Sequence, residues 1–453
     1  RRKPELVDAE TYSLVNFDEF ERVADDYTAL AERADAIRKS LPPAYDDAYV
    51  QLVWYPVTAS ANLNALYYTV ARNRLHAEQG RADTNALAEE AEILFARDDA
   101  LRRVYEEEIA GGKWVSMMSQ THIGYTYWQQ PDEQVMPEVK RIKVPEAAGL
   151  GVAVAGRREN VALAGAPVEL PEASVFSGEA PNIEIFNTGA TPYQATIETG
   201  VDWARPANRT VTVGASSEVA FDIDWGRVPE GRTIVPVTVD AGALGSTVVN
   251  LPVSKPEGAA SASGFVAVNG HVSAEAADAT RRVSSGDIKW ATLPNLGRSG
   301  DSLTSLPVTA PASEPSGASP RLEFDLHLFE AGDVDVTVTL APTQDFLGQG
   351  GLRYAVSIDD GAPVIVNLHE GDTGGEGSAD WERAVANYAY EMTTVLNVAE
   401  PGAHTLKLWR VDPGVVFQRV LVATGDVPES YLGPPLTPVC MASDEPLPDC
   451  SSP

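Results

Sequence analysis

This sequence has no long apolar run and no excess of basic residues. It also contains few histidines and few cysteines. No run of eighteen consecutive apolar residues occurs, so no membrane-spanning helix is predicted. Lysine and arginine total 34 against 65 aspartate and glutamate, which gives a net charge of −31. Nucleic acids and anionic membranes bind basic surfaces, so this balance argues against both as partners. A chain of 453 residues, 44% of them hydrophobic, is expected to form several globular domains.

The sequence contains no recognisable metal-binding or phosphate-binding motif. The six histidines are scattered, without the paired spacing that is typical of zinc sites. Phosphate-binding G-x-x-x-x-G-K-[ST] loops and G-x-S-x-G nucleophile elbows do not occur. The sequence therefore predicts no metal and no cofactor. Neighbouring acids, such as Asp98 and Asp99, residues 106–108, and Asp359 and Asp360, are expected to be solvated surface groups rather than catalytic pairs.

The two cysteines, Cys440 and Cys450, enclose the polar segment MASDEPLPD. We expect a small disulfide loop, which implies an oxidising compartment and hence a secreted or periplasmic protein. A pair of free thiols and a cross-link to another chain are the alternatives. The sequence starts at Arg1 without a methionine or a following apolar stretch, so we expect a processed or truncated piece of a longer protein.

Residues 1–145 have the pattern of an antiparallel helical bundle. Asn16 followed by Glu19 is typical of a capping box, and apolar residues then recur at three-to-four spacing. Further helices are predicted over residues 44–80 and 83–112. Long helices joined by short turns pack antiparallel to one another.

The pattern changes to short, alternating, β-branched segments from about residue 182. Residues 146–256 are predicted to form an immunoglobulin-like β-sandwich. After a linker rich in Ser, Ala and Gly, residues 262–436 predict a second all-β sandwich, of the jelly-roll or carbohydrate-binding-module type. Residues 437–453 are expected to form an irregular tail. The predicted fold class is thus multidomain α + β, a helical bundle followed by two sandwiches.

One stretch, GGKWVSMMSQTHIGYTYWQQPDEQVMP at residues 111–137, separates the helical pattern from the β pattern. Its aromatic and amide side chains suit either a polar core or a surface that meets a sugar. A histidine here could donate to a uronic-acid carboxylate or a hydroxyl, or it could be buried against a backbone carbonyl. The aromatic rings could likewise stack on sugars or pin the segment in place. The candidate substrate-binding residues are Trp114, Gln120, His122, Tyr125, Tyr127 and Trp128.

Several strings of this sequence carry a resemblance to a known family. In the helical part these are YPVTASANLNALYYTVARNR, QGRADTN, GGKW and QTHIGYTYWQQP. In the last domain they are LRYAVSIDD, LWRVDPGVVFQ and SYLGPP. In this order they resemble glycoside hydrolase family 115, the xylan α-1,2-glucuronidases, and the likeness covers nearly the whole chain apart from the tail.

The resemblance implies a role without catalysis for this chain. Enzymes of the family are similar in having a (β/α)₈ barrel, which holds the active site, ahead of the helical bundle. No part of this sequence matches that barrel, so no catalytic residue is assigned to this chain. The resemblance implies the C-terminal portion of an enzyme that removes (4-O-methyl)glucuronic acid side chains from glucuronoxylan.

The partners expected from this resemblance are glucuronoxylan or its oligosaccharides, the barrel of the same chain, and a second copy in a homodimer. This portion would support the barrel, oligomerise or contact glycan. The alternative is a free-standing secreted carbohydrate-binding or scaffold protein with no catalysis.

Overall fold

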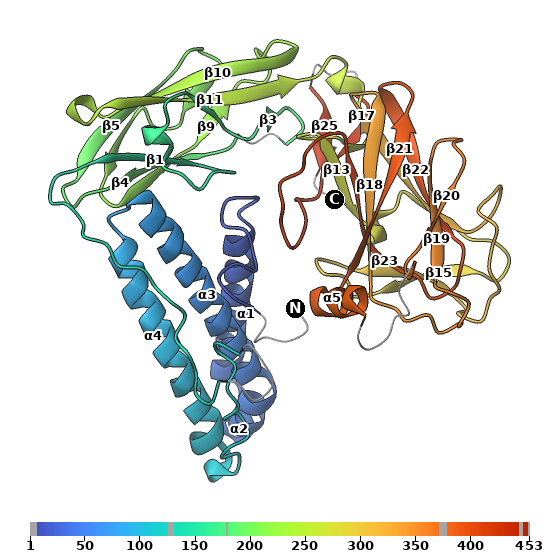
Figure 1. Cartoon of the computed structure of the whole chain (residues 1–453), viewed down its shortest axis with the longest axis horizontal. Helices are drawn as coiled ribbons and strands as arrows, with labels where there is room; N and C mark the ends of the chain where they lie inside the picture. Colours follow the sequence, from blue (N-terminus) through green and yellow to red (C-terminus); the bar gives the residue numbers. More distant parts are fainter. Residues whose placement is uncertain (1–6, 126–130, 178–179, 371–377, 444–446, 452–453) are drawn as a thin grey trace.

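The computed structural model describes residues 7–125, 131–177, 180–370, 378–443 and 447–451. Within them a helical region is followed by several β-sheets, which confirms the multidomain α + β class. Figure 1 shows the helices projecting away from a middle β unit and a C-terminal β unit. The immunoglobulin-like and jelly-roll assignments of these two units stay predictions. Among the described residues, no helix is both long and apolar enough to cross a membrane.

The helical region is built on long helices whose apolar faces meet in one cluster. Buried Phe20, Leu66, Val70 and Ala91 belong to that cluster. A π-helical turn precedes α3 and another follows α4. The elements are α1 (Glu19–Ser40), α2 (Asp46–Tyr49), the π-turn Val50–Trp54, α3 (Tyr55–Gln79), α4 (Thr84–Arg103) and the π-turn Val104–Glu108.

The predicted capping box at the start of α1 is wrong. Asp18 occupies the position before the helix in a left-handed conformation and makes no side-chain cap. The Glu19 side chain is instead fully buried at 0% exposure. It accepts a hydrogen bond from the Ser13 amide at 2.8 Å and from the Leu432 amide at 2.5 Å. A distant segment therefore captures the carboxylate that a local cap would have used.

The middle β unit encloses a core between facing sheets, where Ile185 and Val152 of one sheet meet Val237 and Leu251 of the other. One sheet has the order β1-β4-β8, and the other has the order β2-β11-β10-β5-β7 with β3 beside β11. Strands β6 and β9 pair with each other. Their bounds are β1 (Leu150–Val154), β2 (Val168–Glu169), β3 (Ala173–Ser174), β4 (Ile183–Asn187), β5 (Tyr193–Thr199), β6 (Ala204–Pro206), β7 (Thr210–Val213), β8 (Ser216–Val219), β9 (Phe221–Ile223), β10 (Gly231–Asp240) and β11 (Ser246–Lys255).

The C-terminal β unit has the same two-layer plan around buried Phe324, Val336, Tyr354 and Phe417. The strand orders are β20-β19-β22-β17-β12-β24-β25 with β14 beside β17, and β15-β16-β23-β18-β21 with β13 beside β23. The bounds are β12 (Gly264–Val266), β13 (His271–Glu275), β14 (Arg281–Val283), β15 (Lys289–Leu293), β16 (Ser302–Leu306), β17 (Arg321–Leu328), β18 (Gly332–Leu340), β19 (Arg353–Ile358), β20 (Val364–Asn367), α5 (Ala379–Asn387), β21 (Tyr390–Val398), β22 (Gly402–Arg410), β23 (Val416–Ala423), β24 (Val439–Met441) and β25 (Asp449–Ser451).

The expectation of an irregular tail is wrong for its two strands. Strand β24 pairs antiparallel with β12, and β25 pairs antiparallel with β24. Cys440 lies directly opposite Cys450 in this register and is bonded to it. The tail therefore extends a sheet of the C-terminal unit.

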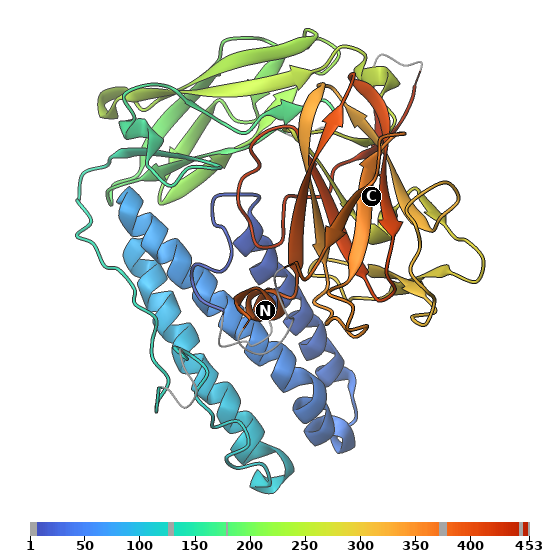
Figure 2. The same cartoon turned by 45° about the vertical axis from the view of Figure 1, so that its right-hand side comes forward.

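Both β units attach to the same end of the helical region. At the turn between α3 and α4, the Ala82 amide donates to the Asn187 carbonyl at 2.8 Å, and Arg81 forms an ion pair with Glu184 at 2.6 Å. Ahead of α1, the Asn16 side-chain amide donates to the Glu429 carbonyl at 2.9 Å. The opposite end, with α2, points away from both β units (Figure 1 and Figure 2).

Replacing Glu19 by alanine is expected to destabilise the protein. The substitution leaves two partly buried amides, of Ser13 and Leu432, without their acceptor, which costs about 2–4 kcal/mol in the free energy of unfolding. Urea unfolding followed by tryptophan fluorescence measures this loss. Glu32→Ala, at an exposed position of the same helix, is the control and should change stability by no more than about 0.5 kcal/mol. Equal stability of the two variants would contradict the anchoring role of Glu19.

Candidate functional site

The segment 113–125 leaves the far end of α4 and lies back on the helices, where it covers two acidic side chains. Asp98 is 7% exposed and Glu106 is 2% exposed. These two acids were expected to be solvated, and that expectation is wrong because the segment covers them. Asp98 lies on α4, and Glu106 lies in the π-turn Val104–Glu108 that continues it.

His122 is held in place through both of its ring nitrogens. Its Nε2 lies 3.0 Å from an Asp98 carboxylate oxygen. The Gln134 side-chain oxygen accepts the amides of His122 and Ile123 at 3.0 and 2.7 Å, which directs the Gln134 Nε2 at the His122 Nδ1, 2.9 Å away. In the neutral ring, Nδ1 therefore accepts from Gln134 while Nε2–H donates to Asp98. A protonated ring would donate from Nδ1 to the Gln120 carbonyl, 3.1 Å away.

Glu106 anchors the preceding part of the segment. Its carboxylate accepts the Met118 amide and the Ser119 hydroxyl, each at 2.8 Å, and also pairs with Arg102. Burial alone raises the pKa of Glu106, but the hydrogen bonds from Ser119, Met118 and Arg102 outweigh it and hold the pKa below its ordinary value. Burial, with Asp98 and Glu106 nearby, raises the pKa of Tyr55 to about 12.

The sequence-predicted residues occupy different places in this segment. Trp114 is half-buried against the apolar cluster of Val50, Tyr105 and Ile109. Tyr125 is buried, and Gln120 is exposed. Tyr127 and Trp128 lie outside the described residues. Substrate binding by this set stays a prediction.

Asp98, Glu106 and Gln134 complete the network of hydrogen bonds around this segment, and the sequence did not predict them as site residues. The only signal for the two acids was their place near the end of one predicted helix, which does not reveal what covers them. Gln134 reaches His122 because residues 134 and 135 lie beside residues 122 and 123. The Val135 amide donates to the Ile123 carbonyl at 3.1 Å. That pairing is not visible in local spacing.

A separate cleft of about 1260 Å³ lies where the helical region and both β units meet. From α3 it is lined by Tyr68 and Arg72, with the Arg72 guanidinium 5.4 Å from the centre of the Tyr68 ring. Arg232 of the middle unit and His271 of the C-terminal unit contribute to its other walls. Within the described residues, no group of three or more His, Cys, Asp or Glu side chains is arranged to hold a metal ion.

Comparison with known families identifies the last unit. Residues 264–436 match the family model of the glycosyl hydrolase family 115 C-terminal domain. The C-terminal unit belongs to that family. The relationship predicted from the sequence strings is thus confirmed for this portion. The matched range begins at the first residue of β12 and ends before β24, so the disulfide-linked strands lie beyond it.

Solved structures similar to this chain include a family GH115 4-O-methyl-alpha-glucuronidase with specificity for decorated arabinogalactans. The identity is 15%, the match covers 90% of this chain and 33% of that chain, and the TM-score is 0.47. The chain thus spans about a third of the length of that enzyme.

Carbohydrate-binding modules are also among the similar structures. A family 35 module from Clostridium thermocellum has 14% identity over 33% of this chain and 97% of its own, with a TM-score of 0.24. The module CBM6cm-2 of Cellvibrio mixtus lichenase 5A, in complex with cellotriose, has 10% identity over 34% of this chain and 98% of its own, with a TM-score of 0.22. No protein with a curated description matches the chain.

The lowered pKa of Glu106 predicts an acid-dependent contribution to stability. Because the folded-state pKa lies below the ordinary value of 4.5, the charged form favours the folded state. This contribution is fully present above the ordinary pKa and is lost as the pH falls through the lowered folded pKa. Glu106→Gln should therefore be less stable than the wild type near neutral pH, and the difference should shrink toward about pH 3. Urea unfolding at a series of pH values measures it, and a constant difference would contradict the assignment.

Loss of the Asp98 carboxylate is expected to loosen the segment it binds. In Asp98→Ala, amide hydrogen exchange over residues 119–125 should accelerate roughly tenfold, because local opening becomes easier without the contact to His122. Asp99→Ala is the matched control, since that neighbouring side chain is 49% exposed and faces Arg102 and Arg103. Equal exchange in both variants would show that Asp98 does not hold the segment.

Proposed function

We propose that this chain is the non-catalytic C-terminal part of an α-glucuronidase of glycoside hydrolase family 115, which removes (4-O-methyl)glucuronic acid from glucuronoxylan. The helical region supports the catalytic barrel of the same polypeptide, and the chain alone is inactive. The family match of residues 264–436 supports the membership on which this proposal is built. An oxidising, secreted or periplasmic setting fits the bonded Cys440 and Cys450.

One observation supports the proposal that the helical region supports the barrel. Large apolar side chains are exposed at the projecting end of the helices. Leu52 is 73% exposed there, and Tyr45, Val115 and Met117 are also more than half exposed. Large apolar side chains gathered at one end of a soluble region mark a surface that another protein part covers. Since this end points away from both β units (Figure 2), the part that covers it is not one of them.

The segment 113–125 begins at this same end, so we propose that it lies beside the barrel. Gln120 and the partly exposed His122 would then meet substrate or barrel residues, with Trp114 and Tyr125 packed behind them. The Asp98 and Gln134 contacts would set the orientation of the imidazole before anything binds.

Incubation of the purified chain with glucuronoxylan, and in parallel with a decorated arabinogalactan, tests the claim of inactivity. No release of glucuronic acid is expected from either polymer. Clear release would overturn the proposal that catalysis resides outside this chain. Sequencing upstream of the Arg1 codon tests the barrel, and an open frame encoding alternating strands and helices is expected.

Exposed apolar side chains at the projecting end should make the isolated chain self-associate. Leu52→Glu places a charge in that surface and is expected to reduce association measured by light scattering at high protein concentration. Leu163→Glu is the matched control, because Leu163 is an 81% exposed leucine of the middle unit. If the two substitutions have the same effect, the projecting end is not the covered surface.

A further inference from the structure

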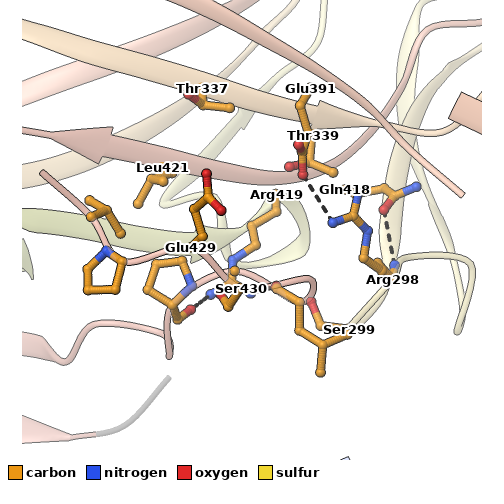
Figure 3. A pocket seen from close by; sticks show the side chains of 15 residues that line it. Arg298, Ser299, Thr337, Thr339, Glu391, Gln418, Arg419, Leu421, Glu429 and Ser430 are labelled. Atoms are coloured by element: carbon orange, nitrogen blue, oxygen red, sulfur yellow. Dashed lines mark hydrogen bonds and ion pairs between the residues drawn. The ribbon is translucent and has the colours of Figure 1, made fainter. Parts of the chain in front are cut away.

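The C-terminal unit contains a small polar pocket that the proposed function does not use. Its volume is about 200 Å³. The floor is formed by β18 and β23, and the segment 427–434 forms one wall. Figure 3 shows the Glu391 and Glu429 carboxylates directed into it from different sides. A ligand of this size is a single small ring rather than a polymer segment.

The charges around the pocket balance. Its charged lining residues are Arg298, Arg419, Glu391 and Glu429. Arg298 forms an ion pair with Glu391 at 3.0 Å. The Arg419 guanidinium donates to the Ser273 hydroxyl at 3.0 Å and to the Leu432 carbonyl at 2.7 Å, so its donors already have partners. A net charge of zero favours a neutral ligand over an ion.

The pocket wall also contains polar groups without partners. Arg298 is a side chain with only 10% exposure. Its Nε and the Ser430 hydroxyl are both buried and have no hydrogen-bond partner among the residues that the structure describes. Buried polar groups are normally paired, and an unpaired one is unfavourable. Hydroxyl groups of a ligand both donate and accept, so they would pair with the carboxylates and hydroxyls that line the pocket.

Other residues of the pocket add further hydroxyl groups and an apolar group. Thr337 and Thr339 of β18 add hydroxyl groups, and Leu421 of β23 adds an apolar patch. A sugar ring combines hydroxyls at its edge with C–H groups on its faces, and adjacent hydroxyls can bond to both oxygens of one carboxylate. We infer that this pocket binds one neutral sugar residue, with adjacent hydroxyls on the Glu391–Arg298 pair and on Glu429.

The site is independent of the proposed catalytic barrel. Its walls come from the C-terminal unit alone, so a failure to bind sugar would leave the role of the helical region untouched. Conversely, binding by the isolated chain would stand even if that role were disproved.

Calorimetric titration of the whole chain with xylotriose and with galactobiose tests the inference. Saturable binding of at least one of these neutral probes is expected, with little dependence on salt. Glu429→Gln should weaken it roughly tenfold, because a charge-assisted hydrogen bond is lost. The Glu429 contact to Asn16 uses the backbone carbonyl, so this variant keeps its fold. Thr339→Val is a second variant and should weaken binding roughly threefold.

Glu400→Gln, an exposed position in the same unit, is the matched control and should bind as the wild type does. The inference is overturned if neither neutral probe binds, or if Glu429→Gln and Thr339→Val bind with unchanged affinity. It is also overturned if glucuronic acid or a lysine amide binds instead with a steep salt dependence, since the site would then recognise charge.

Discussion

The buried carboxylate of Glu19 is the contact on which the placement of the C-terminal unit against the helical region depends. It receives one amide from the loop ahead of α1 and another from Leu432 in the C-terminal unit. Since a buried carboxylate is strongly disfavoured unless its oxygens are hydrogen-bonded, the helix start and the distant segment must be in place together. The neighbouring contact between Asn16 and the Glu429 carbonyl adds to the same joint. The position of the C-terminal domain thus follows from the first turn of one helix.

The same principle explains the segment 113–125. Glu106 and Asp98 are stable in the interior because Met118, Ser119 and His122 supply donors to them. The helices themselves could be predicted, because apolar spacing is a local signal. The environment of their acids could not, since it depends on a segment that folds back from farther along the chain.

Recognition of the last domain from its sequence was possible because long strings such as LWRVDPGVVFQ are specific. The paired strands near the C-terminus were missed for a physical reason. Strands β24 and β25 are only three residues each, and β24 pairs with Gly264 and Phe265, far away in the sequence. Such short strands have no periodicity of their own. The pocket beside Glu429 was equally hidden, because its walls come from several separate stretches of the chain.

Because both β units attach to one end of the helices, each of the three units contacts the other two. Arg81 contacts the middle unit, Glu19 contacts the C-terminal unit, and the β units touch each other where the Phe176 and Phe329 rings stack at 5.4 Å. The covalent connection between the β units at residues 256–263 is therefore not what keeps them together. A protease that nicks this connection would give two bands on a denaturing gel, while the particle would still elute as one species of unchanged size.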